Sequence, residues 1–169
     1  MKIVVISDTH IPASAEGIPK KIKDEIKNCD CVIHAGDATE MNVIEELRLL
    51  AVTYAVQGNM DSLEIKQTLP EKLLFQADGK TIGVVHGHGP SFAVIRSVKK
   101  AFKGKKPDVI IFGHSHTPFN EMINKTLFFN PGSVNDRMFS PYRSFGIIEI
   151  TDGNIKAEII RLDENAGQS

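Results

Sequence analysis

The chain has 169 residues, of which 41% are hydrophobic and 24% charged, and its formal net charge is −1 at pH 7. This composition is typical of a globular domain, and the near-zero charge gives no general reason to expect binding to nucleic acid or to an acidic membrane. No apolar run approaches the roughly 20 residues that a membrane-spanning helix needs, which argues against a membrane protein. We expect one domain over residues 1–162 and a polar, disordered tail over residues 163–169.

The first third of the chain alternates between strand and helix patterns. Short β-branched apolar runs predict buried strands, and apolar residues at helical spacing predict amphipathic helices between them. The predicted strands cover residues 2–7, 31–36 and 52–57, and the predicted helices cover residues 18–28 and 40–50, with Thr39 as the N-cap of the second helix. Because no cleavage region follows the first run, we interpret it as a strand and not as a signal peptide. This alternation is typical of a parallel sheet with crossover helices.

The rest of the chain adds hairpins. Strand pairs around short turn sequences are predicted over residues 72–87, 118–130 and 144–160, with turns at Asp78-Gly79, Asn124-Lys125 and Asp152-Gly153-Asn154. A helix over residues 91–104 is expected to end at Gly104, and residues 108–113 form another apolar strand. The order of elements therefore predicts an α/β fold of mixed sheets, in which a parallel part comes first and helices lie outside.

Cys29 and Cys31 are separated by one residue, which is too close for a good disulfide, and no second cysteine pair offers structural-zinc spacing. Reduced thiols are the simpler interpretation, and they favour a cytoplasmic protein.

Polar side chains end five of the predicted strands. The blocks are SDTH (7–10), HAGD (34–37), QGNMD (57–61), HGHG (86–89) and GHSH (113–116), and they contain all six histidines of the chain. One histidine at a strand end is ordinarily a hydrogen-bonded, half-buried residue, and one aspartate there is ordinarily a turn former or helix cap. Five such blocks together indicate convergence, because the carboxyl ends of parallel strands meet at one crevice.

Carboxylates and imidazoles brought to one place are costly unless a cation or dense hydrogen bonding compensates for their desolvation. A mixed set of imidazole, carboxylate and amide oxygen suits Mn²⁺, Fe²⁺, Zn²⁺, Co²⁺ or Ni²⁺ better than Ca²⁺. Seven ligand candidates are too many for one tetrahedral zinc and fit two ions that share a carboxylate.

The blocks DTH (8–10), GD (36–37), GNMD (58–61), HGH (86–88) and GHSH (113–116), in this order and followed by NPGSV (130–134), resemble the calcineurin-like metallophosphoesterase superfamily. The resemblance covers nearly the whole chain. The small size and the lack of a cap domain look like its small bacterial and archaeal phosphodiesterase branch, which also includes the metallophosphatase-like subunit of retromer.

The resemblance implies a four-layer α-β-β-α sandwich of two mixed sheets flanked by helices, with a dinuclear metal site at the carboxyl ends of the strands. It assigns Asp8, His10 and His116 to one ion, Asn59, His86 and His114 to the other, and Asp37 to both. Manganese is the first choice of metal, and nickel, iron, zinc and cobalt are the alternatives.

The chemistry that the resemblance implies is activation of water by the two ions for in-line attack on phosphorus, with Asp37, Asn59 and His114 as the central catalytic residues. Residues 114 and 116 on an extended chain would lie roughly 6.5 Å apart and face the same way, so that each imidazole reaches a different ion. Gly113 would let the backbone pass close to the site.

One position departs from the family pattern. Many members carry a histidine after the asparagine, where it is thought to protonate the leaving group, and here the residue is Met60, which cannot donate a proton. We therefore expect good turnover of activated aryl esters and slow turnover of simple alkyl esters. His88 is either a substitute acid or a hydrogen-bonding neighbour of a metal ligand.

Further polar residues have both a functional and a structural interpretation. His34 either supports a ligand or is a satisfied core histidine, and Asp61 either orients a metal-bound histidine or caps a helix. Arg137 and Arg143 either rim the site or are solvated loop residues. The lysine run at residues 99–106 either complements a helix C-terminus or attracts a polyanionic substrate.

The leading function is a phosphodiesterase acting on a small phosphodiester or a nucleotide-like substrate. The first alternative is a catalytically weak or inactive scaffold that binds a protein partner, and the second is a nuclease. Polymeric nucleic acid is disfavoured as a substrate because the chain has neither a strongly basic face nor an appended domain. Apolar residues expected to be exposed around Phe128 and Phe129 would allow a homo-oligomer.

Overall fold

The computed structural model describes residues 1–162, and the predicted tail at 163–169 lies outside the described residues. One five-stranded sheet has the order β10-β9-β1-β2-β3. Its strands are β1 (Lys2–Ile6), β2 (Cys31–His34), β3 (Thr53–Ala55), β9 (Ser144–Thr151) and β10 (Asn154–Arg161). β1, β2 and β3 run parallel, whereas β9 pairs antiparallel with β1 and continues into a hairpin with β10.

The second five-stranded sheet has the order β4-β5-β6-β8-β7. Its strands are β4 (Lys72–Ala77), β5 (Lys80–Val85), β6 (Val109–Ile111), β7 (Phe119–Ile123) and β8 (Thr126–Asn130). β5, β6 and β8 are parallel, and hairpins add the two edge strands β4 and β7. Both sheets are therefore mixed, as the sequence predicts: the parallel strands β1, β2 and β3 form one side of the first sheet, and β5, β6 and β8 form the centre of the second.

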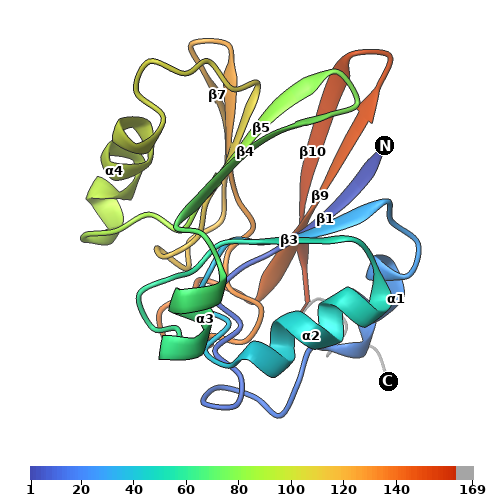
Figure 1. Ribbon diagram of the computed structural model, residues 1–169, viewed down its shortest axis with the longest axis vertical. Helices are drawn as coiled ribbons and strands as arrows, with labels where there is room; N and C mark the ends of the chain where they lie inside the picture. The colour runs from blue at the N-terminus through green and yellow to red at the C-terminus, as the bar shows by residue number, and fades with distance from the viewer. Residues whose placement is uncertain (163–169) are drawn as a thin grey trace.

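Helices cover the outer faces of the two sheets (Figure 1). α1 (Lys20–Ile26) and α2 (Met41–Leu50) pack on the first sheet, and α4 (Val94–Ala101), preceded by the short η1 (Ser91–Ala93), packs on the second. Side chains alternate along β1: Val4 and Ile6 belong to the apolar cluster beneath α1 and α2, whereas Ile3 and Val5 belong to the cluster between the sheets. The predicted four-layer sandwich is confirmed.

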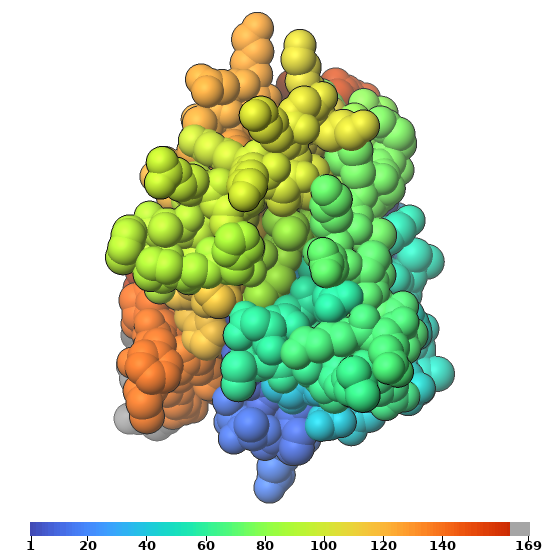
Figure 2. Space-filling view, turned by 60° about the vertical axis from the view of Figure 1, so that its left-hand side comes forward, coloured from blue at the N-terminus to red at the C-terminus, as the bar shows by residue number. Residues whose placement is uncertain are grey.

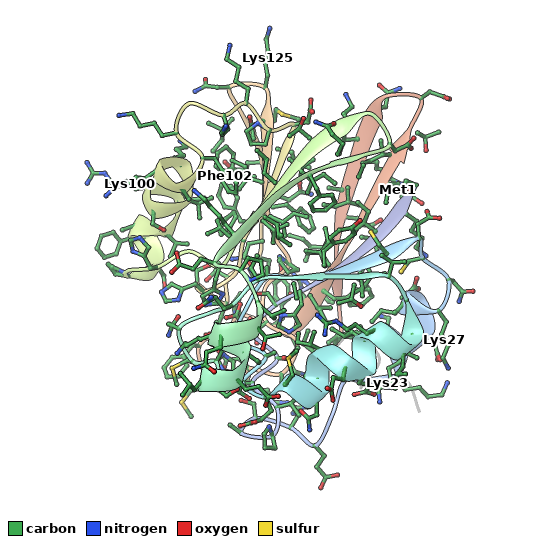
Figure 3. The ribbon with its side chains drawn as sticks, viewed as in Figure 1. Met1, Lys23, Lys27, Lys100, Phe102 and Lys125 are labelled. Atoms are coloured by element: carbon green, nitrogen blue, oxygen red, sulfur yellow. The ribbon has the colours of Figure 1, made fainter. Side chains whose placement is uncertain are left out.

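Phe102, just after α4, anchors this helix to the second sheet, toward which its ring points in Figure 3. A Cβ atom at Gly83 on β5 would lie 2.8 Å from the ring, so the glycine makes room for it. On the other side of the molecule, Lys23 on α1 and Glu46 on α2 form an ion pair of 2.5 Å that links the two helices.

Two predictions about helix ends are wrong, and one helix was missed. The N-cap of α2 is Glu40, and Thr39 instead adopts a φ of 75° and donates its hydroxyl to the Ile11 carbonyl. α4 ends at Ala101, and Gly104 lies in the following turn with a φ of 79°. The helix α3 (Leu63–Thr68) was not predicted, because its six residues are too few to show a helical period; Ser62 caps it by accepting from the Ile65 amide at 3.5 Å.

The predicted hairpin turns are confirmed. Asp78, Asn124, Lys125 and Asp152 all have positive φ, as two-residue hairpin turns of this type require. The expected exposure around Phe128 and Phe129 is wrong, since these side chains are 4% and 0% exposed, and they offer no surface for a second copy. Across residues 1–162, no helix has the length and apolar character to cross a membrane.

Candidate metal centre

The polar blocks of both sheets meet at the carboxyl ends of their parallel strands. The closest approach involves Gly113, which follows β6. A Cβ atom at this position would overlap the Ser7 hydroxyl and lie 2.8 Å from Asp8 Oδ2 at the end of β1. The prediction that Gly113 lets the backbone pass close to this site is therefore confirmed.

The site is built on strained backbone. Ten non-glycine residues of the described part of the chain have positive φ, and five of them are predicted metal ligands: Asp8 (52°), His10 (47°), Asp37 (58°), His114 (67°) and His116 (55°). Side chains at such positions cost energy that the surrounding structure must offset, and they concentrate at functional sites. The extended conformation predicted for residues 114–116 is wrong, because both histidines are in left-handed turns.

One cluster of donors consists of Asp8, His10 and His116, whose ligand atoms all lie within 4.8 Å of one another. His116 Nε2 is 3.3 Å from Asp8 Oδ1 and 3.3 Å from His10 Nε2. A second cluster consists of Asp8, Asp37 and His86, with His86 Nε2 lying 3.2 Å from Asp37 Oδ2. Asp37 Oδ2 is also 3.8 Å from His10 Nε2, so this carboxylate lies between the two clusters.

Asn59 and His114 join the second cluster. Asn59 Oδ1 is 3.2 Å from His86 Nε2 and 2.9 Å from His114 Nδ1. Backbone carbonyls fix the tautomers of both rings: His86 Nδ1 donates to Ala35 and His114 Nε2 donates to Gly89, each at 2.8 Å. When both rings are neutral, His86 Nε2 and His114 Nδ1 direct lone pairs toward Asn59 Oδ1, which is itself an acceptor. A cation among the three atoms would satisfy all of them, whereas a proton on His86 satisfies only His86 Nε2.

Asp8 carries the clearest unmet demand for a cation. Its Oδ2 atom accepts hydrogen bonds from the Ser7 hydroxyl and from the His114 amide, whereas its Oδ1 atom, buried between the two clusters, has no hydrogen-bond partner within residues 1–162. A buried carboxylate oxygen without a hydrogen bond is costly, and the imidazoles around it, of which His116 Nε2 at 3.3 Å is the nearest, offset this cost only when they are protonated. The donor set of carboxylate, imidazole and amide oxygen therefore fits divalent transition metals.

In the metal-free protein, the carboxylates and imidazoles of the cluster shift one another's pKa values. Burial opposes the charged forms, but hydrogen bonds and charge attraction outweigh it: the pKa values of the Asp8 and Asp37 carboxyls are lowered, mainly by His116 and His86. In return, Asp37 and Asp8 raise the pKa of His86 to about 9, and Asp8 and Asp136 raise the pKa of His116 to about 9. Protons on the two imidazoles thus replace the positive charge that the carboxylates require.

Residues 1–153 match the calcineurin-like phosphoesterase superfamily domain. The chain belongs to this superfamily. A probable metallophosphoesterase of Methanocaldococcus jannaschii is 37% identical over 166 residues, which cover 97% of this chain and 83% of the relative. A phosphodiesterase of the same archaeon is 31% identical over 146 residues, which cover 78% of this chain and 83% of the relative. The predicted family is confirmed.

A solved structure has the same fold. The crystal structure of wild-type Vps29 from Entamoeba histolytica in complex with zinc is 24% identical, and the superposition covers 95% of this chain and 99% of that chain with a TM-score of 0.72. At this level of identity the likeness establishes the fold of this metallophosphoesterase and nothing of its partners.

His34 is a satisfied core histidine in this metallophosphoesterase. It is fully buried, Nε2 lies 3.1 Å from the Thr9 hydroxyl, and Nδ1 accepts from the Gly36 amide at 3.2 Å. Burial lowers the pKa of the ring to about 4, so it is neutral at pH 7. His34 therefore ties the 7–10 block to the 34–37 block from beneath the site.

Asp61 has neither of the two predicted roles. Its carboxylate accepts from the backbone amides of Gly58 at 2.6 Å, Thr39 at 2.7 Å and Asp37 at 3.2 Å, and Ser62 is the residue that caps α3. The side chain thus holds the two loops that carry Asp37 and Asn59 in one arrangement.

The remaining predicted residues lie around the cluster. His88 is exposed and borders one recess beside Asn59 and His86, and Arg137 and Arg143 border another recess beside His10 and His116. None of these three side chains is a metal-ligand candidate by distance within the described residues.

Sequence reasoning missed Asp136 and its neighbours. Asp136 Oδ2 is 2.5 Å from His116 Nδ1, and the pKa of this carboxyl is lowered because the His116 contact and the Met138 and Phe139 amides outweigh the effect of burial. Two neighbours, Ser133 and Asn135, donate to the Asp8 and Thr9 carbonyls at 2.7 Å each. The signal was the NPGSV block itself, which the resemblance noted without assigning roles to the residues that follow it.

Proposed function

We propose that this metallophosphoesterase is a phosphodiesterase that holds two divalent metal ions. One ion would be held by Asp8, His10 and His116, the other by Asn59, His86 and His114, with Asp37 contacting both. The observation that carries the proposal is the convergence of three imidazoles, those of His10, His86 and His116, on Asp8 Oδ1. Two of them, His10 and His86, also approach Asp37 Oδ2, and Asn59 joins His114 to this group through His86. Without metal ions, the negative charge of the Asp8 and Asp37 carboxylates is balanced by protons on His86 and His116.

Two bound ions would supply an activated water for in-line attack on phosphorus and neutralise the developing negative charge. Around them, Asp37 and Asn59 position the ions, while Asp136 and the carbonyls of Ala35 and Gly89 hold the imidazole tautomers. Manganese is our first choice, and nickel, iron, zinc and cobalt suit the same donors; the zinc complex of the Vps29 neighbour keeps zinc among them.

A preference for diesters is supported by two recesses that border the cluster. One, of about 550 Å³, includes Asn59 and His86, and the other, of about 640 Å³, includes His10 and His116; they share no lining residue. A phosphodiester has two substituents to place, and a monoester has one. The relative named a phosphodiesterase agrees with this preference. We propose small diesters or nucleotide-like esters as substrates, because recesses of about 550 and 640 Å³ are of the size that holds a small molecule.

A protein-binding scaffold is the second candidate function. Large apolar side chains are exposed near the cluster. They are Met60 (61%) beside Asn59, Leu63 (71%) at the start of α3, Phe92 (90%) in η1, and Met138 (80%) and Phe139 (76%) in the recess that includes His10 and His116. Exposed apolar groups around a site are typical of interaction surfaces. The free thiols of Cys29 and Cys31 support the proposal that the protein is cytoplasmic. The apolar cluster shared by the two sheets supports the proposal that residues 1–162 act as one domain.

The test compares hydrolysis of bis(p-nitrophenyl) phosphate and p-nitrophenyl phosphate by metal-stripped protein to which Mn²⁺, Ni²⁺, Zn²⁺ or Mg²⁺ is returned. The variant Asp37→Asn removes a charge and keeps a residue that tolerates the φ of 58°, and Asp152→Asn is its matched control at a φ of 50° in a distant turn. We expect metal-dependent diester hydrolysis that Asp37→Asn abolishes and Asp152→Asn preserves. Metal binding without hydrolysis of either ester would favour the scaffold.

A further inference from the structure

The recess that includes Asn59 and His86 is unusually rich in lysine. Lys66 on α3, Lys72 on β4 and Lys100 on α4 all line it, and we call it the lysine recess. Figure 2 shows this face of the molecule, where the green segment around α3 lies below the yellow-green segment that carries α4. Three cations from three elements thus border a hollow of about 550 Å³ that opens beside the metal cluster.

Two of these ammonium groups are held in place without being neutralised. Lys66 Nζ donates to the Asn59 carbonyl at 2.8 Å, and Lys72 Nζ donates to the Ala101 carbonyl at 3.1 Å. Within the described residues, no ion pair joins Lys66, Lys72 or Lys100 to a carboxylate. Glu71 is the acidic side chain of the lining, so the recess carries three lysines against one carboxylate.

Lysines elsewhere on the molecule have other partners. Lys20 pairs with Asp24 and Lys23 pairs with Glu46. The neighbour of Lys100 on α4, Lys99, lies over the Phe128 ring at 5.5 Å from its centroid and borders a different hollow. Lys99 and Lys100 on α4 therefore border different hollows, and Lys100 lines the recess that includes Asn59 and His86.

The opposite recess has a different character. It combines Arg137 and Arg143 with the exposed apolar side chains of Met138 and Phe139, and it already contains the Asp136 carboxylate. Arginine and an aromatic ring suit a planar or apolar substituent. The two substituents of a bound diester would thus meet different chemistry on the two sides of the cluster.

We infer that the lysine recess binds a second phosphate group, so that the substrate is a phosphodiester with an additional phosphate on one of its substituents. This inference rests on the proposed function. Lysine ammonium groups with free donors form charge-assisted hydrogen bonds to phosphate oxygens, and such bonds are stronger in a partly enclosed site. The additional phosphate would lie farther from the metal cluster, toward Lys100 on α4.

The experiment uses two matched esters: thymidine 5′-(p-nitrophenyl phosphate) and the same compound with a 3′-phosphate. Hydrolysis of either adds water across the same P–O bond and releases p-nitrophenol, so the two differ only in the remote phosphate. For the manganese-loaded protein we expect the 3′-phosphate to raise kcat/KM about tenfold or more, mainly through KM, and to lose this advantage as the salt concentration rises. A ratio near one would overturn the inference.

The variants locate the effect. Combined Lys66→Ala, Lys72→Ala and Lys100→Ala substitutions should bring the ratio near one. Because the ratio compares two esters on the same variant, any effect of these substitutions on the rest of the diester site changes both rates alike. Lys99→Ala is the matched control on α4 and should keep the ratio. An advantage that survives the triple substitution would place the second phosphate elsewhere and contradict the inference.

Calorimetry separates this inference from the proposed function. Thymidine 3′,5′-bisphosphate should bind the metal-loaded protein about tenfold or more tightly than thymidine 5′-monophosphate, with the difference lost in the triple variant. Equal affinities would overturn the lysine recess as a phosphate site, whether or not any ester is hydrolysed. Absence of hydrolysis with a lysine-dependent difference in affinity would instead contradict the phosphodiesterase proposal alone.

Discussion

His116 Nδ1 lies 2.5 Å from Asp136 Oδ2, so the imidazole donates a hydrogen bond to a carboxylate on the side away from the cluster and turns Nε2 toward Asp8 Oδ1 at 3.3 Å. This arrangement matches the way in which proteins orient metal-binding histidines, with a carboxylate that fixes the tautomer and raises the basicity of the ligand. Asp136 is therefore a positioning residue for the proposed metal centre, although it contacts none of the other donors.

Replacing Asp136 should weaken metal binding without removing a ligand. We expect Asp136→Ala to lower the affinity for Mn²⁺ about 10- to 100-fold, because His116 loses its fixed tautomer, and Asp136→Asn to have a smaller effect, because its amide oxygen still accepts from Nδ1. Chelator competition measures both values, and Asp78→Ala in an exposed turn is the control. Equal affinities of Asp136→Ala and the wild type would show that His116 needs no partner.

The pH dependence of stability should change sign with metal. The pKa values of His86 and His116 are raised to about 9 in the folded, metal-free protein, above the value of about 6.5 in an unfolded chain. Their contribution to stability is fully present below pH 6.5 and is lost as the pH rises through 9, so the Tm of the chelator-treated protein should fall over this window. Added metal requires neutral imidazoles, and its stabilising effect should grow over the same window. Thermal denaturation in both conditions measures this, and parallel curves would contradict it.

Gly113 should tolerate no side chain. A Cβ atom there would overlap the Ser7 hydroxyl where the two sheets meet, so Gly113→Ala should destabilise the fold by about 3 kcal/mol and reduce metal binding. Gly17 has no atom within 4 Å of an added Cβ, and Gly17→Ala should change stability by less than about 1 kcal/mol. Urea unfolding of the two variants gives the comparison, and similar midpoints would show that the sheets adjust.

Because Met60 cannot protonate a leaving group, the protein should hydrolyse esters with good leaving groups faster than esters with poor ones. The Met60 side chain is 61% exposed, and its amide donates to Asp37 Oδ1 at 2.7 Å, so a proton donor at this position would lie beside the cluster. The wild type should hydrolyse bis(p-nitrophenyl) phosphate well and a dinucleoside monophosphate slowly. Met60→His should raise the second rate about tenfold and leave the first nearly unchanged. Met122→His, also 61% exposed, is the control, and equal wild-type rates for both esters would contradict the account.

Much of the fold could be predicted from local patterns. The apolar runs of β1, β2 and β6 end at polar blocks, and two of the three hairpin turns carry Asp-Gly pairs whose conformational preference is strong. The sequence did not predict α3, because its six residues span fewer than two helical turns. Thr39 was wrongly predicted as an N-cap, because its conformation is set by a contact with Ile11 from another loop. Such contacts depend on the assembled fold and leave no periodic signal in the chain.

The candidate site shows the same division. Asp8, Asp37 and the GHSH block were predicted from residue type and position at strand ends. The partners of the ligands were not, because Asp136 and the carbonyls of Ala35 and Gly89 lie 20 to 51 residues away in the sequence from the histidines that they contact. The left-handed backbone at His114 and His116 was also unpredicted, since strain of this kind is offset by packing that only the structure shows.

The most direct test of the account is to count the metal ions that activity requires. Metal-stripped protein is titrated with Mn²⁺ under conditions of tight binding, and bound metal and the rate of bis(p-nitrophenyl) phosphate hydrolysis are measured on the same samples. The account predicts that the rate saturates at two ions per chain, and that Asp37→Asn lowers both values. Full activity at one ion per chain, or activity that persists without metal, would contradict the dinuclear centre.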